Sequence, residues 1–328
     1  MHFAFTEDQL LFKEGLREFL AGECTAADVR VAWENEAGRV PGLWNKLAEL
    51  GVVGLTAPES AGGMGLGEID LVGLMEEMGR SAVPEPIIEH TSVAIPALAE
   101  AGKTEVLAAA AIGEATVTVV NPRAPYALHG ADADWIIVEI DGELRLGASD
   151  SLPMEHQPAL DGSRRLYRLD VPRGWGEPLD ANPALAFDRG ALATASQCVG
   201  LARHLIETTV AYVSYRHQFG KPVGTYQAVK HHLANAAMAV EFAAPVVAYA
   251  SWACANNVPE RSREVSMAKV LASDAVDLAA EHALQCHGAI GYTYEYDLQL
   301  WLKRAWALSA AWGDAGWHRD RVGRALGI

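Results

Sequence analysis

Cysteine is scarce in this chain of 328 residues, and the few cysteines that it has are scattered. The four are Cys24, Cys198, Cys254 and Cys286, and none belongs to a Cys-x-x-Cys pair. This spacing argues against a disulfide scaffold and against a zinc site, and it is typical of reduced thiols in the cytoplasm. We therefore expect a cytoplasmic protein without a bound metal.

Positive charge is also scarce. The chain has 26 lysines and arginines against 42 aspartates and glutamates, for a formal net charge of −16. Proteins that bind nucleic acid carry a basic surface stripe, so no nucleic-acid partner is expected. Any anionic ligand must be met by a few local cations, because the field of the whole molecule repels it.

Long apolar runs and several common active-site motifs are missing as well. No apolar run reaches about 18 residues without a charge, and residues 1–5 lack the basic start of a secretory signal, so no membrane association is expected. The sequence contains no Gly-x-Ser-x-Gly elbow, no P-loop and no Rossmann fingerprint.

Three regions differ in the spacing of their apolar residues. Residues 1–112 and 181–328 show helical periodicity, whereas 113–180 contains short alternating runs that predict strands. The last region predicts four long helices, at about 186–217, 225–256, 260–286 and 294–325. The expected fold is mainly α with a small middle β domain, an N-terminal helical domain and a C-terminal four-helix bundle.

Strands are expected at 116–120, 135–140, 143–146 and 166–171, with Asp141-Gly142 as a hairpin turn. On the last predicted helix, Trp301, Trp306 and Trp312 recur at steps of five and six residues. We expect these tryptophans to be packing or interface residues, on or near a contact face of the bundle.

The stretch from Arg216 to Gln227 lies between two of the long helices. Arg216 is a forked donor that suits a phosphate, while Gln218, Gln227 and the rings of Phe219 and Tyr226 suit a flat heteroaromatic ligand. A polar turn with a surface arginine is the simpler interpretation.

Three motifs in order resemble those of the acyl-CoA dehydrogenase family. The stretch just described resembles its Arg-x-x-Phe-Gly-x-Pro-x-x-x-x-Gln signature, and residues 285–292 resemble its Gln-x-x-Gly-Gly-x-Gly-Tyr turn. Near the N-terminus, the glycine-rich run 58–65 is followed by Glu-Glu-Met-Gly-Arg at 76–80.

This resemblance implies an FAD site and α,β-desaturation of an acyl-CoA thioester, with electron-transferring flavoprotein or a similar acceptor. The residues that it places at the diphosphate and adenine half of FAD are Arg216, Gln218, Phe219, Gln227, Gln285, Gly288 and Ala289. Ala289 stands where the family usually has a second glycine. A helix end with an arginine and a turn of small residues both suit a diphosphate.

The chain departs from the family in two places. The middle region lacks the Thr-Glu-Pro…Gly-Ser-Asp and Trp-Ile-Thr-Asn segments that hold the flavin ring and the acyl-CoA, and is short for a full β domain. The catalytic base of the family would fall at Gly313, nine residues after Arg304, or at Gly190, 26 residues before Arg216. Asp314 is the nearest carboxylate to the first position, and a helix C-cap or a surface charge is its alternative role.

The resemblance is therefore to the shorter subunit of the heterotetrameric acyl-CoA dehydrogenases of bacterial sterol side-chain degradation. It implies a longer partner subunit that supplies the base and the flavin-ring contacts, and a bulky acyl group. Two alternatives stay open: a self-sufficient homo-oligomer with Asp314 as base, and a flavin-free scaffold or regulatory protein.

Overall fold

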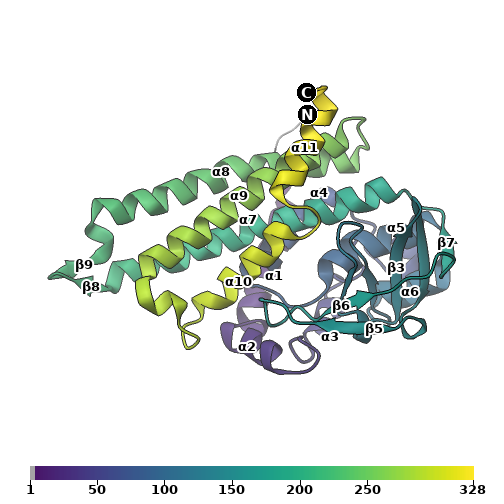
Figure 1. The fold of residues 1–328 in the computed structure, drawn as a ribbon, viewed down its shortest axis with the longest axis horizontal. Helices are drawn as coiled ribbons and strands as arrows, with labels where there is room; N and C mark the ends of the chain where they lie inside the picture. Colours follow the sequence, from purple (N-terminus) through teal and green to yellow (C-terminus); the bar gives the residue numbers. More distant parts are fainter. Residues whose placement is uncertain (1–3) are drawn as a thin grey trace.

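The computed structural model describes residues 4–328 and confirms the expected fold class (Figure 1). Helices come first, a small β region follows, and a bundle of long helices ends the chain. The N-terminal helices are α1 (Glu7–Glu23), α2 (Ala26–Glu34), α3 (Leu43–Glu49), α4 (Glu68–Arg80), the π-helical η2 (Ile88–Ala94), α5 (Ile95–Glu100) and α6 (Thr104–Ala111), with a short 3₁₀ turn η1 (Glu59–Ala61).

Glycines allow α4 to lie directly against the first helix of the bundle, α7 (Pro183–Tyr215). A Cβ on Gly200 would stand 1.7 Å from the carbonyl oxygen of Glu76, and one on Gly79 would stand 2.1 Å from that of Gln197. Real side chains do not approach so closely, so both residues must be glycine for the two backbones to touch. Gly79 belongs to the Glu-Glu-Met-Gly-Arg motif. The close contact of the two backbones explains why this motif has a glycine at that position.

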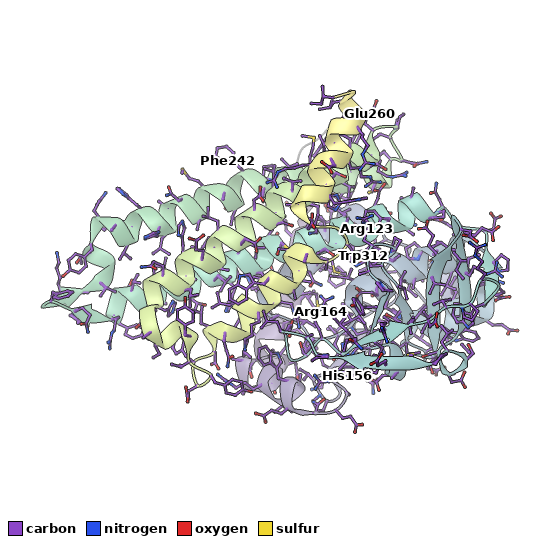
Figure 2. The ribbon with its side chains drawn as sticks, in the orientation of Figure 1. Arg123, His156, Arg164, Phe242, Glu260 and Trp312 are labelled. Atoms are coloured by element: carbon purple, nitrogen blue, oxygen red, sulfur yellow. The ribbon has the colours of Figure 1, made fainter. Side chains whose placement is uncertain are left out.

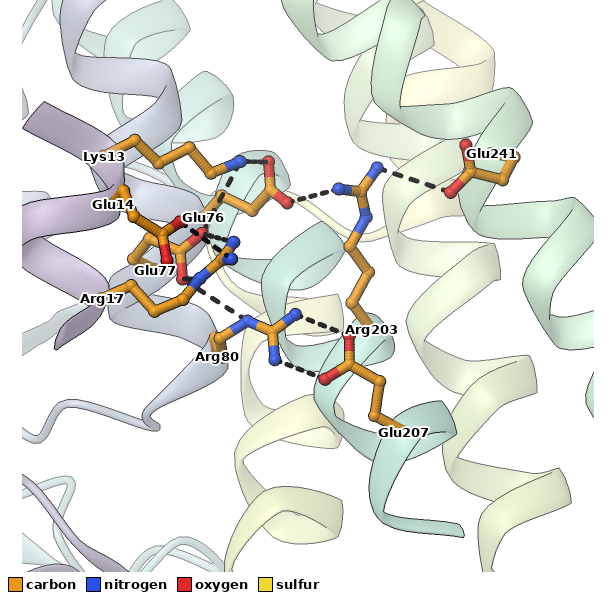
Figure 3. A network of polar contacts seen from close by, with 9 residues as sticks. All are labelled: Lys13, Glu14, Arg17, Glu76, Glu77, Arg80, Arg203, Glu207 and Glu241. Carbon is orange, nitrogen blue, oxygen red and sulfur yellow. Dashed lines mark hydrogen bonds and ion pairs between the residues drawn. The ribbon is translucent and has the colours of Figure 1, made fainter. Parts of the chain in front are cut away.

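A polar network on the same motif ties α4 to α1 and α7 (Figure 3). Glu77 is 1% exposed and accepts two hydrogen bonds from Arg17, from Nε at 2.9 Å and from a terminal nitrogen at 2.8 Å. Lys13 and Arg80 lie 3.6 and 3.4 Å from its oxygens. The buried carboxylate is therefore satisfied by three cations from two helices.

The β region consists of two small sheets. The four-stranded sheet has the order β1-β3-β4-β7, with β1 (Val117–Val119) parallel to β3 (Trp135–Ile140) and the other pairs antiparallel. The three-stranded sheet has the order β2-β6-β5. The remaining strands are β2 (Tyr126–Leu128), β4 (Glu143–Ala148), β5 (Met154–Gln157), β6 (Leu166–Leu169) and β7 (Glu177–Leu179), with 3₁₀ turns η3 (Gly130–Asp132) and η4 (Ser149–Ser151).

Two cores hold these parts together. A small one lies between the two sheets and includes Ile136, Val138 and Leu169. The large one is continuous from the N-terminal helices through the bundle, and it takes in one face of the four-stranded sheet through Val117 and Ile137. The β region is thus anchored to the helices by the sheet itself.

The bundle contains α7, α8 (Gln227–Ala255), α9 (Arg261–His287), α10 (Leu298–Ala310) and α11 (Ala315–Leu326), with η5 (Val223–Thr225) and η6 (Gly288–Tyr292) between them. The prediction of one continuous helix at 294–325 is wrong. The chain leaves helical geometry at Ala311, whose ψ angle is +146°, and Trp312 and Gly313 follow with φ angles of +55° and +94°. Asp314 then starts a new helix as its N-cap.

By length and composition, α8 could cross a membrane, the one such helix among residues 4–328. A single helix of this kind is weak evidence for a membrane span, because bundle helices have similar compositions. Its outer side carries Phe242 and Met238, which are 73% and 55% exposed (Figure 2). This side of α8 is an apolar surface.

Candidate functional site

The signature stretch forms a hairpin at the tip of the bundle (Figure 1). Arg216 ends α7, and β8 (His217–Gln218) pairs with β9 (Lys221–Pro222) across a turn in which Phe219 and Gly220 have φ angles of +53° and +81°. The Phe219 ring is 92% exposed. The Arg216 guanidinium is exposed too, and it donates no hydrogen bond to, and forms no ion pair with, any residue of 4–328. Arginine, amide and ring are thus presented outward.

The second motif lies at the same end of the bundle. Tyr212, one turn before Arg216, stacks on His287 with ring centroids 4.2 Å apart, and Gly288 follows His287 directly. Gly288 has φ +65° with open space beside it, so a ligand can reach its backbone. Gln285 and Ala289 are exposed next to it.

Gln227 lies at the start of α8, where its amide nitrogen is 3.0 Å from His231 Nε2. The structure therefore gathers all seven residues predicted to contact FAD at one end of the bundle. Their exposed donors and their accessible backbone fit a phosphate-bearing ligand. That they bind FAD stays a prediction.

A cleft of about 310 Å³ lies between the β region and α10, far from the hairpin. Its walls are mostly apolar and include Val119, Leu160, Leu166, Trp306 and Ala310. Its polar lining comes from Glu89 on η2, from Asp161 and Arg164 in the loop before β6, and from Asn121 and Tyr126. Figure 2 shows Arg164 and Trp312 where the bundle meets the β region.

Glu89 is a buried acid of this cleft, at 5% exposure. Its Oε1 accepts a 3.3 Å hydrogen bond from the Trp312 indole, and its Oε2 has no hydrogen-bond partner. Burial raises the pKa of Glu89, an effect that the nearby cations Arg164 and Arg304 oppose. The carboxyl therefore keeps its proton to a higher pH than an exposed glutamate.

Asp161, Arg164 and the neighbouring Arg304 differ in how many of their hydrogen bonds are satisfied. Asp161 accepts from Arg304 and from the Ser163 hydroxyl, and Arg304 also donates to the Val83 carbonyl oxygen. These bonds lower the pKa of Asp161 although its burial acts in the opposite direction. The guanidinium of Arg164 has no hydrogen bond or ion pair with any residue of 4–328.

Family models match most of the chain. The model "Acyl-CoA dehydrogenase, N-terminal domain" matches residues 6–110, and "Acyl-CoA dehydrogenase, C-terminal domain" matches residues 183–327. The chain belongs to the acyl-CoA dehydrogenase family. Members of this family are flavoprotein oxidoreductases that act on CH–CH bonds.

Several known acyl-CoA dehydrogenases match over nearly the full length. The chain is 35% identical to acyl-CoA dehydrogenase IpdE2 of Mycolicibacterium smegmatis, covering 92% of this chain and 93% of that one. The Tcur3481-Tcur3483 steroid ACAD superposes with a TM-score of 0.90 at 24% identity, covering 98% of each chain. The ChsE4-ChsE5 complex from Mycobacterium tuberculosis also gives 0.90 at 22% identity, covering 100% of this chain and 99% of that one.

The structure explains why both positions expected for an acyl-CoA dehydrogenase base are glycine. A Cβ on Gly190 would lie 2.4 Å from the indole of Trp312, which is 2% exposed. A Cβ on Gly313 would lie 2.8 Å from His318 Nε2, on a backbone that L residues rarely adopt. No carboxylate fits at either position while Trp312 and His318 stand where they do.

Asp314 has a structural task. It is exposed, and its Oδ1 accepts a 2.8 Å hydrogen bond from the backbone N–H of Trp317 at the start of α11. This makes Asp314 an N-cap, a common role of aspartate, so the expectation of a C-cap is wrong. A role as catalytic base stays a prediction for Asp314.

Two of the three tryptophans are packing residues inside this chain, and a place on an interface stays a prediction for the third. Trp301 is 7% exposed, stacks on His204 with centroids 4.3 Å apart and donates to the Arg80 carbonyl oxygen. Trp312 is buried, and Trp306, at 40% exposure, lines the cleft. Helical spacing alone did not separate these environments, because the helix breaks at Ala311.

No group of three or more His, Cys, Asp or Glu side chains within residues 4–328 is placed to hold a metal ion. Two residues of the cleft, Glu89 and Arg164, were not singled out from the sequence. A glutamate directly after the apolar pair Ile87-Ile88 was the available signal for the first. Nothing in the local sequence separates Arg164 from its neighbour Arg165.

Proposed function

We propose that this chain is the shorter subunit of a two-subunit, FAD-dependent acyl-CoA dehydrogenase. It contributes the diphosphate and adenine half-site for FAD, and a longer partner subunit supplies the contacts to the flavin ring and the catalytic base. The acyl group is bulky, of the kind carried by a steroid nucleus or side chain, and the pair works in the cytoplasm. Electron-transferring flavoprotein or a similar carrier reoxidises the reduced FAD of the complex.

The observation that carries this proposal is the separation between the hairpin and the cleft (Figure 1). The residues suited to the FAD diphosphate lie at the tip of the bundle, whereas the cleft lies where the bundle meets the β region. Gly190, which lies against the cleft residue Trp312, is 26 residues before Arg216 along α7, so about 39 Å of helix separate the two places and one FAD does not contact both within one chain. The exposed hairpin therefore suits an FAD whose ring lies in the cleft of another chain.

Two further observations support an unlike partner. Both positions expected for the base are closed by Trp312 and His318, so a carboxylate must come from elsewhere. The similar fold of two heteromeric proteins, one of them a steroid ACAD, agrees with a bulky acyl group. The apolar outer side of α8, with Phe242 and Met238, offers a surface for association.

In this assembly the residues of this chain bind and orient FAD. Arg216 neutralises diphosphate charge, Gln218 and Gln285 donate amide hydrogen bonds, Phe219 covers an apolar edge, and the Gly288 backbone approaches a phosphate. When bound, FAD would supply the hydride acceptor for the β-hydrogen of the acyl group, and a base would remove the α-proton. No residue of this chain is assigned to that proton transfer.

The test is co-expression with a longer acyl-CoA dehydrogenase and purification through a tag on this chain. The expected product is a stable complex with one FAD for each pair of unlike chains, while the chain alone is colourless or weakly yellow and inactive. Sedimentation combined with flavin absorbance measures both. A yellow, fully active oligomer of this chain alone, with one flavin per subunit, would rule the proposal out.

Arg216→Ala is expected to weaken FAD binding by the complex roughly ten- to hundredfold, because a charge-assisted hydrogen bond is lost. Arg173→Ala is the matched control, since this arginine is 92% exposed on the β region, away from the hairpin. Flavin titration of both variant complexes decides. Equal flavin affinity in the two would remove Arg216 from the site.

A further inference from the structure

The cleft of this chain contains two opposite charges that face the same space without meeting. Arg164 and Glu89 both line the cavity of about 310 Å³, yet no ion pair or hydrogen bond joins them. Glu89 Oε2 is buried and unpartnered, and the Arg164 guanidinium finds no partner within residues 4–328. Buried polar groups are nearly always satisfied, so both groups are available to a ligand.

Neighbouring charges do not remove this availability. Arg304 of α10 and Asp161 are occupied with each other, with Ser163 and with the Val83 carbonyl oxygen. Glu85, just before η2, is paired with Arg39 at 2.5 Å. Burial lowers the pKa of His129 to about 3, so this histidine is neutral. Arg164 is therefore the cation of this cleft that is free to bind an anion.

The remaining walls suit an apolar body. Val119, Leu128, Leu160 and Leu166 from the β region face Trp306, Ala307 and Ala310 of α10. Trp306 and Leu160 are 40% and 59% exposed, so the cavity opens to solvent on the side away from Glu89. A ligand that enters tail first would leave its charge in water, whereas one that enters head first reaches Arg164.

A second cavity of about 300 Å³ provides a contrast. It lies between α4, α7 and α8, and its charged residues are Lys13, Glu76 and Arg203. Both cations there bond the same carboxylate, at 2.8 and 2.9 Å. Its charges are thus neutralised internally.

We propose that the cleft between the β region and α10 is a binding site for an apolar monocarboxylate, whose carboxylate is held by the Arg164 fork beside the unpartnered Glu89 carboxyl. Arg164 donates through its fork, and the Glu89 hydroxyl donates a second hydrogen bond to the same group. The site needs neither flavin nor a partner subunit, so its test is independent of the function proposed above.

Ionisation of Glu89 should control this binding. Burial raises the pKa of this carboxyl, so the proton that it donates is present at lower pH and is lost as the pH rises through the raised value. Once ionised, Glu89 repels the ligand and competes for Arg164. Affinity should fall as the pH is raised, and Glu89→Gln should remove this dependence, because its amide donates at every pH.

The experiment is a calorimetric titration of the full-length chain, in the assembly in which it purifies, with octanoate and with octanamide as the neutral probe. Octanoate is expected to bind more tightly than octanamide, and Arg164→Ala should weaken octanoate roughly ten- to hundredfold while leaving octanamide unchanged. Arg123→Ala is the matched control, because Arg123 is exposed and stands 5.0 Å over the Trp317 ring, outside the cavity.

Ala310→Trp provides a second variant that leaves Arg164 intact. Ala310 is exposed on α10 and lines the cavity, so a bulky side chain there should block octanoate without disturbing the core. The proposal is overturned if octanoate does not bind, if octanamide binds equally well, or if Arg123→Ala and Arg164→Ala weaken binding alike. Binding that resists Ala310→Trp would also overturn it, because the ligand would then lie elsewhere.

Discussion

Gly190 is fixed by a single neighbouring side chain. Its position on α7 faces the Trp312 indole, and an added Cβ would lie 2.4 Å from the ring. Gly190→Ala should lower the free energy of unfolding by about 1–3 kcal/mol, because overpacking outweighs the helix propensity gained. Urea denaturation measures the effect.

Gly15→Ala is the control for that variant. Gly15 is also a helical glycine, on α1, and nothing lies within 4 Å of the position of its Cβ. Alanine should raise stability there by about 0.5–1 kcal/mol. If both variants changed stability in the same direction, the contact with Trp312 would not be the cause.

For Asp314, a role as helix N-cap and a role as catalytic base predict different effects of substitution on turnover. Asparagine caps a helix about as well as aspartate, so Asp314→Asn should preserve stability and keep the activity of the complex within a fewfold of wild type. Asp314→Ala should cost about 1 kcal/mol through loss of the bond to Trp317. A fall in turnover of about a hundredfold or more in Asp314→Asn, with FAD retained, would identify a base instead.

Among the elements, helices were predicted better than strands. Apolar periodicity placed α7, α8 and α9 within a few residues of their ends, because each buries a continuous stripe. The strands β2, β5 and β7 were not predicted from the sequence. Each has three or four residues, and its pairing is decided by a distant partner, such as Arg168 opposite Tyr126.

The candidate site was predictable only where a motif carried it. The signature and the 285–292 turn marked the tip of the bundle, since their residues are close in sequence. Glu89 and Arg164 are brought to one cavity by the packing of η2, a loop and α10, which no local pattern encodes. The break at Trp312 depends on the same packing.

The contact between α1 and α4 depends on Glu77 (Figure 3). Glu77→Ala should lower the free energy of unfolding by about 3 kcal/mol, because it leaves Arg17 and Arg80 beside a half-buried gap without their carboxylate. The control is Glu14→Ala, which removes an ion pair between Arg17 and Glu14, whose side chains are 38% and 55% exposed. This substitution should lower the free energy of unfolding by less than about 1 kcal/mol. Equal losses in the two would show that burial is not what makes Glu77 important.

At the scale of the whole molecule, three buried histidines should make stability sensitive to acid. Burial lowers the pKa of His90 and of His318 to about 4 and that of His129 to about 3. An exposed histidine titrates near ~6.5, so the unfolded chain takes up protons first as the pH falls. Their contribution is complete above about pH 6.5, is lost as the pH drops through this window, and levels off near pH 4.

His90 allows this to be measured. Its Nδ1 accepts from the Val117 N–H at 3.0 Å, and its Nε2 lies 3.1 Å from the Ala110 carbonyl oxygen. Each such group should contribute about 1.4 kcal/mol per pH unit within the window. His90→Gln should reduce the slope of stability against pH, whereas His156→Gln, on the exposed side of β5, should not. An unchanged slope in His90→Gln would contradict the assignment.

The contact between Gly190 and Trp312 also bears on how this sequence can evolve. A carboxylate at position 190 requires a smaller residue at 312, but shrinking the buried indole first opens a cavity that costs about 3–5 kcal/mol. Introducing the carboxylate first forces it into the ring. Either order passes through a destabilised single variant, so a lineage with this pair acquires a carboxylate at position 190 only by two coordinated substitutions. Each residue of the pair therefore constrains the evolution of the other.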